Sequence, residues 1–497
     1  MTKGLVPTRV RAVAASMPSL LPLVAALALG FAPHARAATI VVDDASPASV
    51  PGKCTISDAV AAINNAVAVE GCVAGDGNQD TIDLSGFVAP TTIAFTAPAG
   101  NFGHALVLQN AALIRGGLDT NGAPLVTLTR SSVSGTPEFG LIRTSAPLTL
   151  YGLTLSGGST TQYLGGAVLS GDYLTVDHCT VQNNTSGAAG GGLASTNNLT
   201  LTDSIVSGNH AANAGGGVFS NKQVHIYYST VSGNATDSSQ GLGGGVYAMG
   251  AVMVRNSIVD GNSSAGKGGG IYAGAVATVV NTTISNNQAQ SGTGGGIFAT
   301  RFGVSLSGVT LDGNSASGAG GAVYSGAGDA VLENSTFSGN TAASGAAVLS
   351  QTIEMNYCTI AGNTVLGTGG AVEFTVGASS NGSIVYGNTP QDISTNGKML
   401  DGSLNIVGQS DTLLPTDTLH CNPNLGPLAD NGGLTRSMAI GSDSCALDAA
   451  SAAPTENTDQ RGFARPALGT GHFRADIGAF ELQASEDHEI VFDSSFD

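Results

Sequence analysis

The chain has 497 residues, of which 72 are glycine and only 10% are charged, and its formal net charge is −18. A hydrophobic content of 42% excludes the usual disordered class, and glycine that does not recur at every third residue excludes collagen. The acidic balance argues against binding nucleic acid or anionic lipid by charge.

The first 37 residues have the order of a secretory signal. Lys3, Arg9 and Arg11 form a basic start, Leu20–Phe31 is a short apolar run, and Ala35-Arg36-Ala37 is an A-x-A cleavage site. A buried N-terminal helix is the alternative reading. We predict export to the extracellular space or the cell surface. Cleavage before residue 38 would remove four basic residues and no acid, which changes the charge to −22. No later stretch has the roughly 18 apolar residues of a membrane helix.

The segment after the signal predicts a cap. Residues 38–42 read as a strand, and Thr55 to about Ala68 reads as a helix whose N-cap is Thr55, with Asp58 three residues on. Cys54 and Cys72 flank this helix, and we predict that they form a disulfide, as in other exported proteins. Short apolar segments between Asp80 and Thr154 then predict irregular early strands.

From about Leu153 to Asn388 one motif recurs with a step of 23 to 28 residues. Each unit contains Gly-Asn, or a close variant, then a loop of small residues, and in most units Gly-Gly-Gly before an apolar residue. Such a period is typical of a solenoid. The repeated asparagines are Asn184, Asn209, Asn234, Asn262, Asn287, Asn314, Asn340, Asn363 and Asn388.

The residues around each asparagine predict strands. The third residue before it is always apolar, and the local alternation has a period of two, as in β-strands and unlike helical repeats. We therefore predict an all-β fold, a single parallel β-helix with coils of about 25 residues and a short N-terminal capping helix. Glycine and asparagine tolerate a left-handed backbone, so the Gly-Asn corner and the asparagine column are predicted to be structural.

The other cysteines fall into two groups. Cys421 and Cys445 lie together near the C-terminus and are predicted to form a second disulfide. Cys179 and Cys358 fill the same slot in distant repeats, which at strand spacing places them roughly 30 Å apart. We predict that these two are free and buried.

The repeats resemble those of right-handed parallel β-helix proteins of bacterial surfaces, and in particular the short repeats of polymorphic membrane proteins. The run from Cys54 to Asn64, with Asp80-Thr-Ile-Asp-Leu84 after it, is similar to the CSLREA-type N-terminal region. It departs from that pattern at Ser57-Asp58, where Arg-Glu is usual. These resemblances imply export and a right-handed β-helix.

The C-terminal motifs resemble the choice-of-anchor Q domain. They are Asn424–Gly433, Thr458–Gly462, Arg465-Pro466 and Asp476–Glu481. This resemblance implies no reaction. It suggests the following division of the chain: signal peptide 1–37, N-terminal cap 38–80, parallel β-helix 81–388, choice-of-anchor Q-like region 389–481, and tail 482–497. The C-terminal region is expected to close the far end of the β-helix.

An aromatic column is the first candidate site. The residue after the Gly-Gly-Gly-apolar unit, which reads Gly-Gly-Ala-Val in the fifth case, is aromatic in five successive repeats, and by alternation it points outward. Rings stacked at strand spacing would offer a platform for sugars. The plainer alternatives are rings that only stack on each other or that the C-terminal segment covers. The five predicted ligand-binding residues are Phe219, Tyr247, Tyr272, Phe298 and Tyr324.

A polar corner is the second candidate. Acid, imidazole, phenol and guanidinium groups fall within four successive repeats, a set that a uronate lyase or epimerase could use for proton abstraction and charge neutralisation. A solvated turn is the plainer reading. The residues that would be catalytic are Asp177, His178, Asp203, His225, Tyr228 and Arg255.

Other catalytic patterns are missing from the sequence. Between Gly158 and Asn388 the basic residues other than histidine are Lys222, Arg255, Lys267 and Arg301, too few for a typical pectate lyase. No cofactor is predicted, and the scattered aspartates have no Ca²⁺-ligand spacing.

We therefore predict a non-enzymatic exported protein for binding or adhesion, with a glycan or a surface ligand as partner. A polysaccharide lyase, epimerase or hydrolase is the alternative, and a purely structural rod is a third reading.

Overall fold

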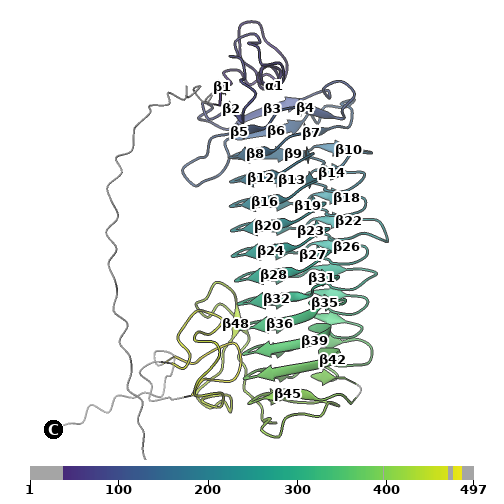
Figure 1. Cartoon of the computed structure of the whole chain (residues 1–497), viewed down its shortest axis with the longest axis vertical. Coiled ribbons are helices and arrows are strands. Elements are labelled where there is room, and N and C mark those ends of the chain that lie inside the picture. Colours follow the sequence, from purple (N-terminus) through teal and green to yellow (C-terminus); the bar gives the residue numbers. More distant parts are fainter. Residues whose placement is uncertain (1–36, 396, 468–473, 484–497) are drawn as a thin grey trace, which may run out of the picture. The chain divides into compact units, whose positions relative to one another are not determined.

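The computed structural model describes residues 37–395, 397–467 and 474–483, which contain a right-handed parallel β-helix of stacked coils (Figure 1). Its strands form three long parallel sheets, which we call sheet 1 (24 strands), sheet 2 (13 strands) and sheet 3 (9 strands). The described residues contain one helix, and no helix among them is long and apolar enough to cross a membrane. The predicted fold class is therefore confirmed.

One coil illustrates the repeat. The chain passes through β21 (Thr230–Ser232) in sheet 2 and β22 (Ala235–Thr236) in sheet 3. After a glycine-rich loop it forms β23 (Val246–Ala248) and β24 (Val252–Arg255), which both belong to sheet 1. Each strand pairs in register with its equivalent in the next coil, so residues at one repeat position form a column along the stack.

The glycines of the repeat have two distinct uses. Gly233, in the Gly-Asn corner, has φ of +61°, and Gly243, the first of a triplet, has φ of +63°. Residues other than glycine rarely adopt this left-handed backbone conformation. The middle glycine of a triplet allows close packing, because a Cβ at Gly216 would collide with the carbonyl oxygen of Gly244 in the next coil.

The asparagine column is a hydrogen-bonded ladder in the interior. The side-chain oxygen of each asparagine accepts from the backbone N–H and the side-chain amide of the asparagine one coil earlier, at 2.8–3.1 Å along the column. The amide also donates to a backbone carbonyl of the preceding coil, as Asn262 does to Val231 at 2.9 Å. The ladder begins at the N–H of Gly158 and ends on the carboxylate of Asp392. Its structural role, predicted from the sequence, is confirmed.

A helix closes the N-terminal end of the core. Helix α1 (Ile56–Asn65) begins at the N-cap Thr55, whose hydroxyl accepts from the N–H of Asp58 at 3.3 Å and donates to its carboxylate at 2.7 Å. Ile56, Val60 and Ile63 are part of the one hydrophobic cluster that continues through the coils. The helix is shorter than predicted because the chain turns left-handed at its C-cap, Ala66 (φ +51°).

The first coils are less regular. They are built from β1 (Thr39–Val41), β2 (Asp80–Asp83), β3 (Thr91–Phe95), β4 (His104–Leu108) and β5 (Ala112–Arg115). The next coils add β6 (Val126–Arg130), β7 (Gly140–Thr144), β8 (Leu148–Tyr151) and β9 (Leu153–Ser156). Sequence reasoning missed β7, which lies outside the regular repeat.

Parallel pairing continues past residue 388, the boundary suggested from the sequence. Two long strands of sheet 1, β39 (Val348–Asn356) and β42 (Val372–Asn381), precede a last coil. That coil consists of β44 (Ile393–Ser394), β45 (Leu400–Ser403) and β46 (Ile406–Val407), which pair with the coil before them. Isolated bridges to Ser410, Leu413 and Leu419 complete this end.

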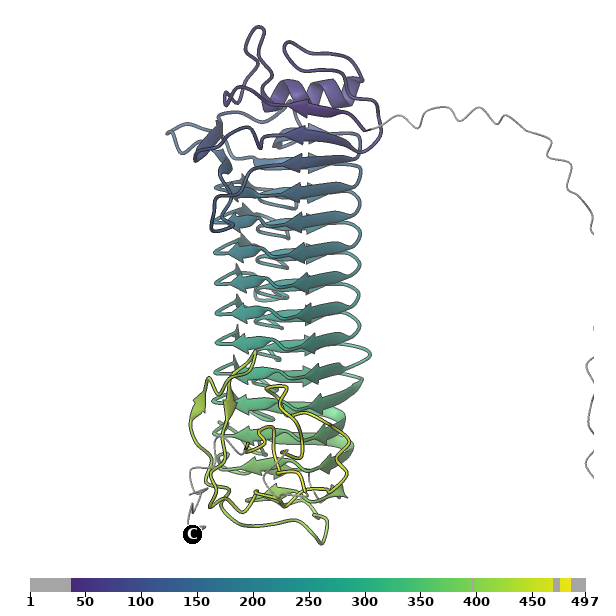
Figure 2. The same cartoon turned by 90° about the vertical axis from the view of Figure 1, so that its left-hand side faces the viewer.

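The C-terminal segment, residues 425–467 and 474–483, lies against the outward face of sheet 2 over the lower coils (Figure 2). It contains a short antiparallel pair, β47 (Leu428–Ala429) and β48 (Ser437–Met438). The expectation that the C-terminal region closes the far end therefore holds only for its first part, and the rest runs along the side of the coils. An apolar cluster that includes Ile384, Ile440 and Ile477 lies between the segment and the sheet.

The cysteines pair as predicted. Disulfides join Cys54 to Cys72 and Cys421 to Cys445. Cys179 and Cys358 are free and buried, and burial raises the pKa of each thiol to about 12, so neither thiol is reactive near neutral pH.

Candidate functional site

The five predicted aromatic residues form one continuous ladder on the outward face of sheet 1. They lie on β19 (Val218–Ser220), β23, β27 (Ile271–Ala273), β31 (Ile297–Ala299) and β35 (Val323–Ser325). In-register pairing of these strands brings each ring next to the ring of the following coil. Ring centroids are 5.1–5.3 Å apart, and the ring planes differ by 1–17°.

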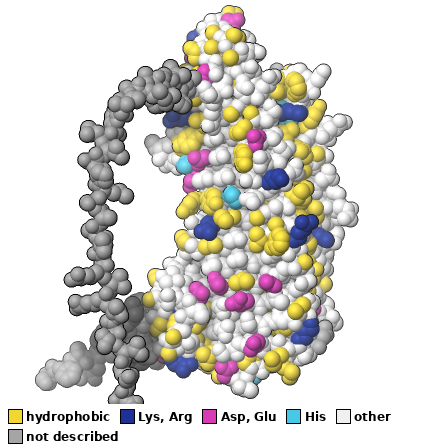
Figure 3. Space-filling view, viewed as in Figure 1, with side chains coloured by type: hydrophobic (Ala, Val, Ile, Leu, Met, Phe, Trp, Pro, Cys, Tyr) yellow, Lys and Arg dark blue, Asp and Glu magenta, His cyan; other side chains and the backbone are white. Residues whose placement is uncertain are grey.

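The rings are partly accessible. The residue before each ring, such as Val246 before Tyr247, is fully buried inside the coil, so the rings point outward as the alternation predicted. Phe298 is only 6% exposed, and the other four rings are half-buried. The ammonium group of Lys267 lies 5.1 Å from the ring centroid of Phe298, within cation–π range. The hydrophobic side chains of this face are visible in yellow in Figure 3.

The stacking changes what the ladder can offer to a ligand. Within the ladder each ring face is covered by the next ring, so only the outer faces of Phe219 and Tyr324 have no ladder ring against them. The ladder presents ring edges and tyrosine hydroxyls outward. A sugar could therefore lie along this apolar strip. The sequence led us to expect exposed ring faces on which a sugar would stack, but most of these faces are covered by the neighbouring rings.

A cavity of about 300 Å³ lies beside the ladder, and sequence reasoning missed it. It is formed at the turns that connect the two sheet 1 strands of a coil. One of these turns connects the strand that carries Phe219 to the strand that carries His225. Only the polar turn Asn221-Lys222-Gln223 could have indicated it in the sequence. Its lining residues are Asn198, Asn221, Lys222, Gln223, Met249 and Gly250.

The polar corner lies between sheets 1 and 2. Here His178, Asp203 and Tyr228 occupy equivalent positions in successive coils, and all three have left-handed φ of +45° to +51°. Asn256, Asn281 and Asn334 continue the same column. Histidine and aspartate tolerate this backbone better than most residues, whereas a tyrosine there is unusual.

The structure brings three of the predicted catalytic residues together. The Nδ1 of His178 lies 2.7 Å from a carboxylate oxygen of Asp177. One ligand atom from each of Asp177, His178 and Asp203 lies within 4.8 Å of the others. The ring of Tyr151 packs against His178, with 5.4 Å between the ring centroids.

Of the other three predicted catalytic residues, Tyr228 lies one coil after Asp203 in the same column, and Arg255 lies three coils after Asp177. His225 is 6.3 Å from Tyr227, measured between ring centroids, on β20 (Val224–Tyr227). Tyr228 is 62% exposed, and Arg255 is exposed and forms no ion pair with another described residue.

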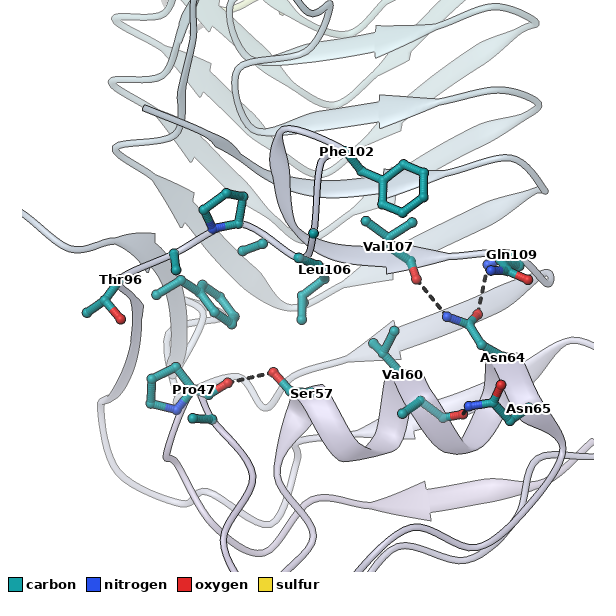
Figure 4. Close-up of a pocket in the computed structure, with 18 residues that line it drawn as sticks. Pro47, Ser57, Val60, Asn64, Asn65, Thr96, Phe102, Leu106, Val107 and Gln109 are labelled. Carbon is teal, nitrogen blue, oxygen red and sulfur yellow. Dashed lines mark hydrogen bonds between the residues drawn. The ribbon is translucent and has the colours of Figure 1, made fainter. Parts of the chain in front are cut away.

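A further cavity, of about 610 Å³, lies between α1 and the first coil (Figure 4). Asn64 spans from the helix to β4: its amide donates to the carbonyl of Val107 at 2.7 Å, and its oxygen accepts from the N–H of Gln109 at 2.8 Å. Neither of the two cavities is lined by Asp177, His178 or Asp203. The polar corner therefore lies outside both of these cavities.

Two family models match the chain. Residues 116–304 match the model described as "Right handed beta helix region". Residues 308–326 match the "Chlamydia polymorphic membrane protein (Chlamydia_PMP) repeat". The comparisons with curated proteins and with solved structures gave no match. The chain is therefore similar to right-handed β-helix repeat proteins, and its resemblances to the CSLREA and choice-of-anchor Q regions stay predictions.

Proposed function

We propose that this right-handed β-helix repeat protein is exported and binds neutral glycans, without catalysis, along the outward face of sheet 1. The aromatic ladder carries the proposal. It is a strip of five rings that repeats at strand spacing, and repeat arrays commonly use such extended surfaces for binding.

The surroundings of the ladder favour a sugar ligand. Four residues with polar side chains line the neighbouring cavity: Asn198, Asn221, Lys222 and Gln223. Apolar contact with a few polar groups close by is the usual composition of a small-ligand site. The acidic net charge of −18 opposes polyanionic chains, so a neutral polysaccharide fits better than a polyuronate.

Three observations support export and a place at the surface. The N-terminal sequence has the order of a signal peptide. Two disulfides are typical of oxidising compartments. The similarity of residues 308–326 to a polymorphic membrane protein repeat agrees with a place at the surface.

A binding experiment tests the proposal. Residues 38–497 would be screened on a glycan array and by pull-down with insoluble polysaccharides. We expect Tyr247→Ala combined with Tyr272→Ala to weaken binding at least tenfold, which is about 1.4 kcal/mol. Tyr247→Phe with Tyr272→Phe keeps the stack and removes the hydroxyls, so it separates ring contact from hydrogen bonding. Tyr173→Ala, an exposed tyrosine outside the ladder, is the matched control.

Two outcomes would overturn this proposal. The first is binding that survives the double alanine variant in a folded protein. The second is polysaccharide degradation that is lost on His178→Ala, which would favour the enzymatic alternative instead.

A further inference from the structure

We propose that Asp177, His178 and Asp203 bind a divalent transition-metal ion such as Zn²⁺ at the polar corner. This is the one group of three or more His, Cys, Asp or Glu side chains with metal-binding geometry among the residues that the structure describes. The site would be independent of the glycan proposal, since none of the three residues belongs to the aromatic ladder.

The fold explains why the three side chains converge. Asp177 ends β12 (Leu174–Asp177), and His178 follows it at the left-handed corner of one coil. Asp203 has the same backbone conformation at the equivalent corner of the next coil. Because successive coils stack in register, the two corners place their side chains one above the other.

The two carboxylates at this corner have no lysine or arginine partner among the described residues, and the only partner of the Asp177 carboxylate among them is the imidazole of His178. Two carboxylates and one imidazole have ligand atoms within 4.8 Å, and no lysine or arginine among the described residues forms an ion pair with them. The carboxylate of Asp203 has no side-chain hydrogen bond or ion pair within the described part of the chain. Carboxylates this close repel each other, and a bound cation would remove that repulsion.

The donor atoms indicate the class of metal. One imidazole nitrogen with two carboxylate oxygens suits Zn²⁺, Mn²⁺ or Ni²⁺. Ca²⁺ prefers six to eight oxygen ligands, and Mg²⁺ also prefers an all-oxygen shell. Three protein ligands at a partly exposed corner leave coordination positions open for water or for an oxygen of a ligand.

The molecule contains a matched control. His210 and Asp237 also form a pair at 2.7 Å, but no third ligand lies close enough to join them among the described residues. If a single His–Asp pair were enough to bind metal, both places would bind it. If three ligands are needed, only the Asp177 corner will.

Isothermal titration of metal-free residues 38–497 with ZnCl₂ at pH 7.5 tests the site. We expect one Zn²⁺ per chain, with Kd of about 10 μM or tighter. We expect His178→Ala and Asp203→Asn each to weaken binding at least tenfold, and His210→Ala to leave it unchanged. Co²⁺ absorption would report ligand geometry directly, and circular dichroism would verify that each variant is folded. Absence of saturable binding, or equal losses in His178→Ala and His210→Ala, would overturn the proposal.

Discussion

Each asparagine of the interior ladder uses both ends of its amide. Asn262, for example, accepts from the N–H and the side chain of Asn234, and donates to the oxygen of Asn287 and to the carbonyl of Val231. It is fully buried. Each asparagine therefore keeps polar groups of two other coils satisfied as well as its own, and a polar group left unpaired in the interior is costly.

Asn262→Ala should be among the most destabilising single changes in the repeat. It leaves the Asn234 groups without their acceptor and the Val231 carbonyl without one donor, so we expect a loss of about 3 to 5 kcal/mol in the free energy of unfolding. Chemical denaturation measures this loss. The control is Asn213→Ala at an exposed loop position, where the change should stay within about 0.5 kcal/mol. Equal effects at the two sites would contradict the role of the ladder.

At the residue scale, the sequence predicted which residues align in columns along the stack better than it predicted their backbone conformations. The column of asparagines and the buried, free state of Cys179 and Cys358 follow from the spacing of the repeat alone. The left-handed backbone at His178 and Tyr228 does not, because a period of two identifies strands and leaves φ at the corners open. The convergence of Asp177 with Asp203 depends on that backbone and on the register, and neither can be read from one coil.

At the scale of the elements, the C-terminal segment is held on sheet 2 by hydrogen bonds to repeated threonines. On the outward face of sheet 2, the hydroxyls of Thr310 and Thr336 donate to the Arg436 carbonyl and to the Gln460 side chain, respectively. Thr359 accepts from the N–H of Ala479. The segment thus forms hydrogen bonds with threonines at one equivalent position in three successive coils. The sequence motifs near residues 458–481 marked this region but not the face on which it packs.

Buried charges hold this segment together. The guanidinium of Arg461 donates to the carboxylate of Asp459 at 2.8 Å, and both side chains are fully buried. Burial, with the nearby charge of Asp476, raises the pKa of Glu481 to about 7. Burial likewise raises the pKa of Asp476 to about 6. The guanidinium of Arg465 lies 3.9 Å from the carboxylate of Glu481, donates to the backbone carbonyl of Asp476 at 2.9 Å, and lies over the ring of Tyr357.

The docking of the segment should weaken as the pH rises. A raised carboxyl pKa means that the folded state holds a proton that the unfolded state has lost, so stability is fully present below about pH 4.5 and is lost as the pH rises through about 7. Between pH 5 and pH 8 we expect hydrogen-exchange protection factors in residues 459–467 and 474–481 to fall at least about tenfold.

Two variants check the assignment to Glu481. Glu481→Gln should reduce the pH dependence of the protection factors, because one of the two carboxyl groups with a raised pKa no longer titrates. Asp430→Asn, at an exposed acid of the same segment, should leave the dependence as it is. Protection that rises between pH 5 and pH 8 in the unmodified chain would refute the sign of the effect.

On the scale of the whole molecule, stability is shared among neighbouring coils. Between Gly158 and Asn388, successive coils make equivalent strand pairs and equivalent ladder bonds with the coils before and after them. In such quasi-one-dimensional arrays the free energy is close to a sum of repeat and interface contributions. The N-terminal helix and the last coil protect the two ends.

Removing one whole coil should therefore be tolerated. Deleting residues 263–287 joins Asn262 to Gln288 and lets Asn262 bond Asn314, so every column stays in register. We expect Tm to fall by no more than about 5 °C. Deleting only 263–274 shifts the register by half a coil and should abolish cooperative unfolding. Circular dichroism melts distinguish the two results, and a whole-coil deletion that fails to fold would contradict this modular behaviour.

The asparagine ladder also gives the molecule a net dipole along the stack of coils. From Asn184 to Asn388 every side-chain amide in the ladder donates toward the C-terminal coil, so the amide dipoles add rather than cancel as they do between strands. The positive end of this row meets the carboxylate of Asp392, which accepts the last two bonds. This row of neutral side chains thus has a net dipole, as an α-helix has, and an acidic residue lies at its positive end.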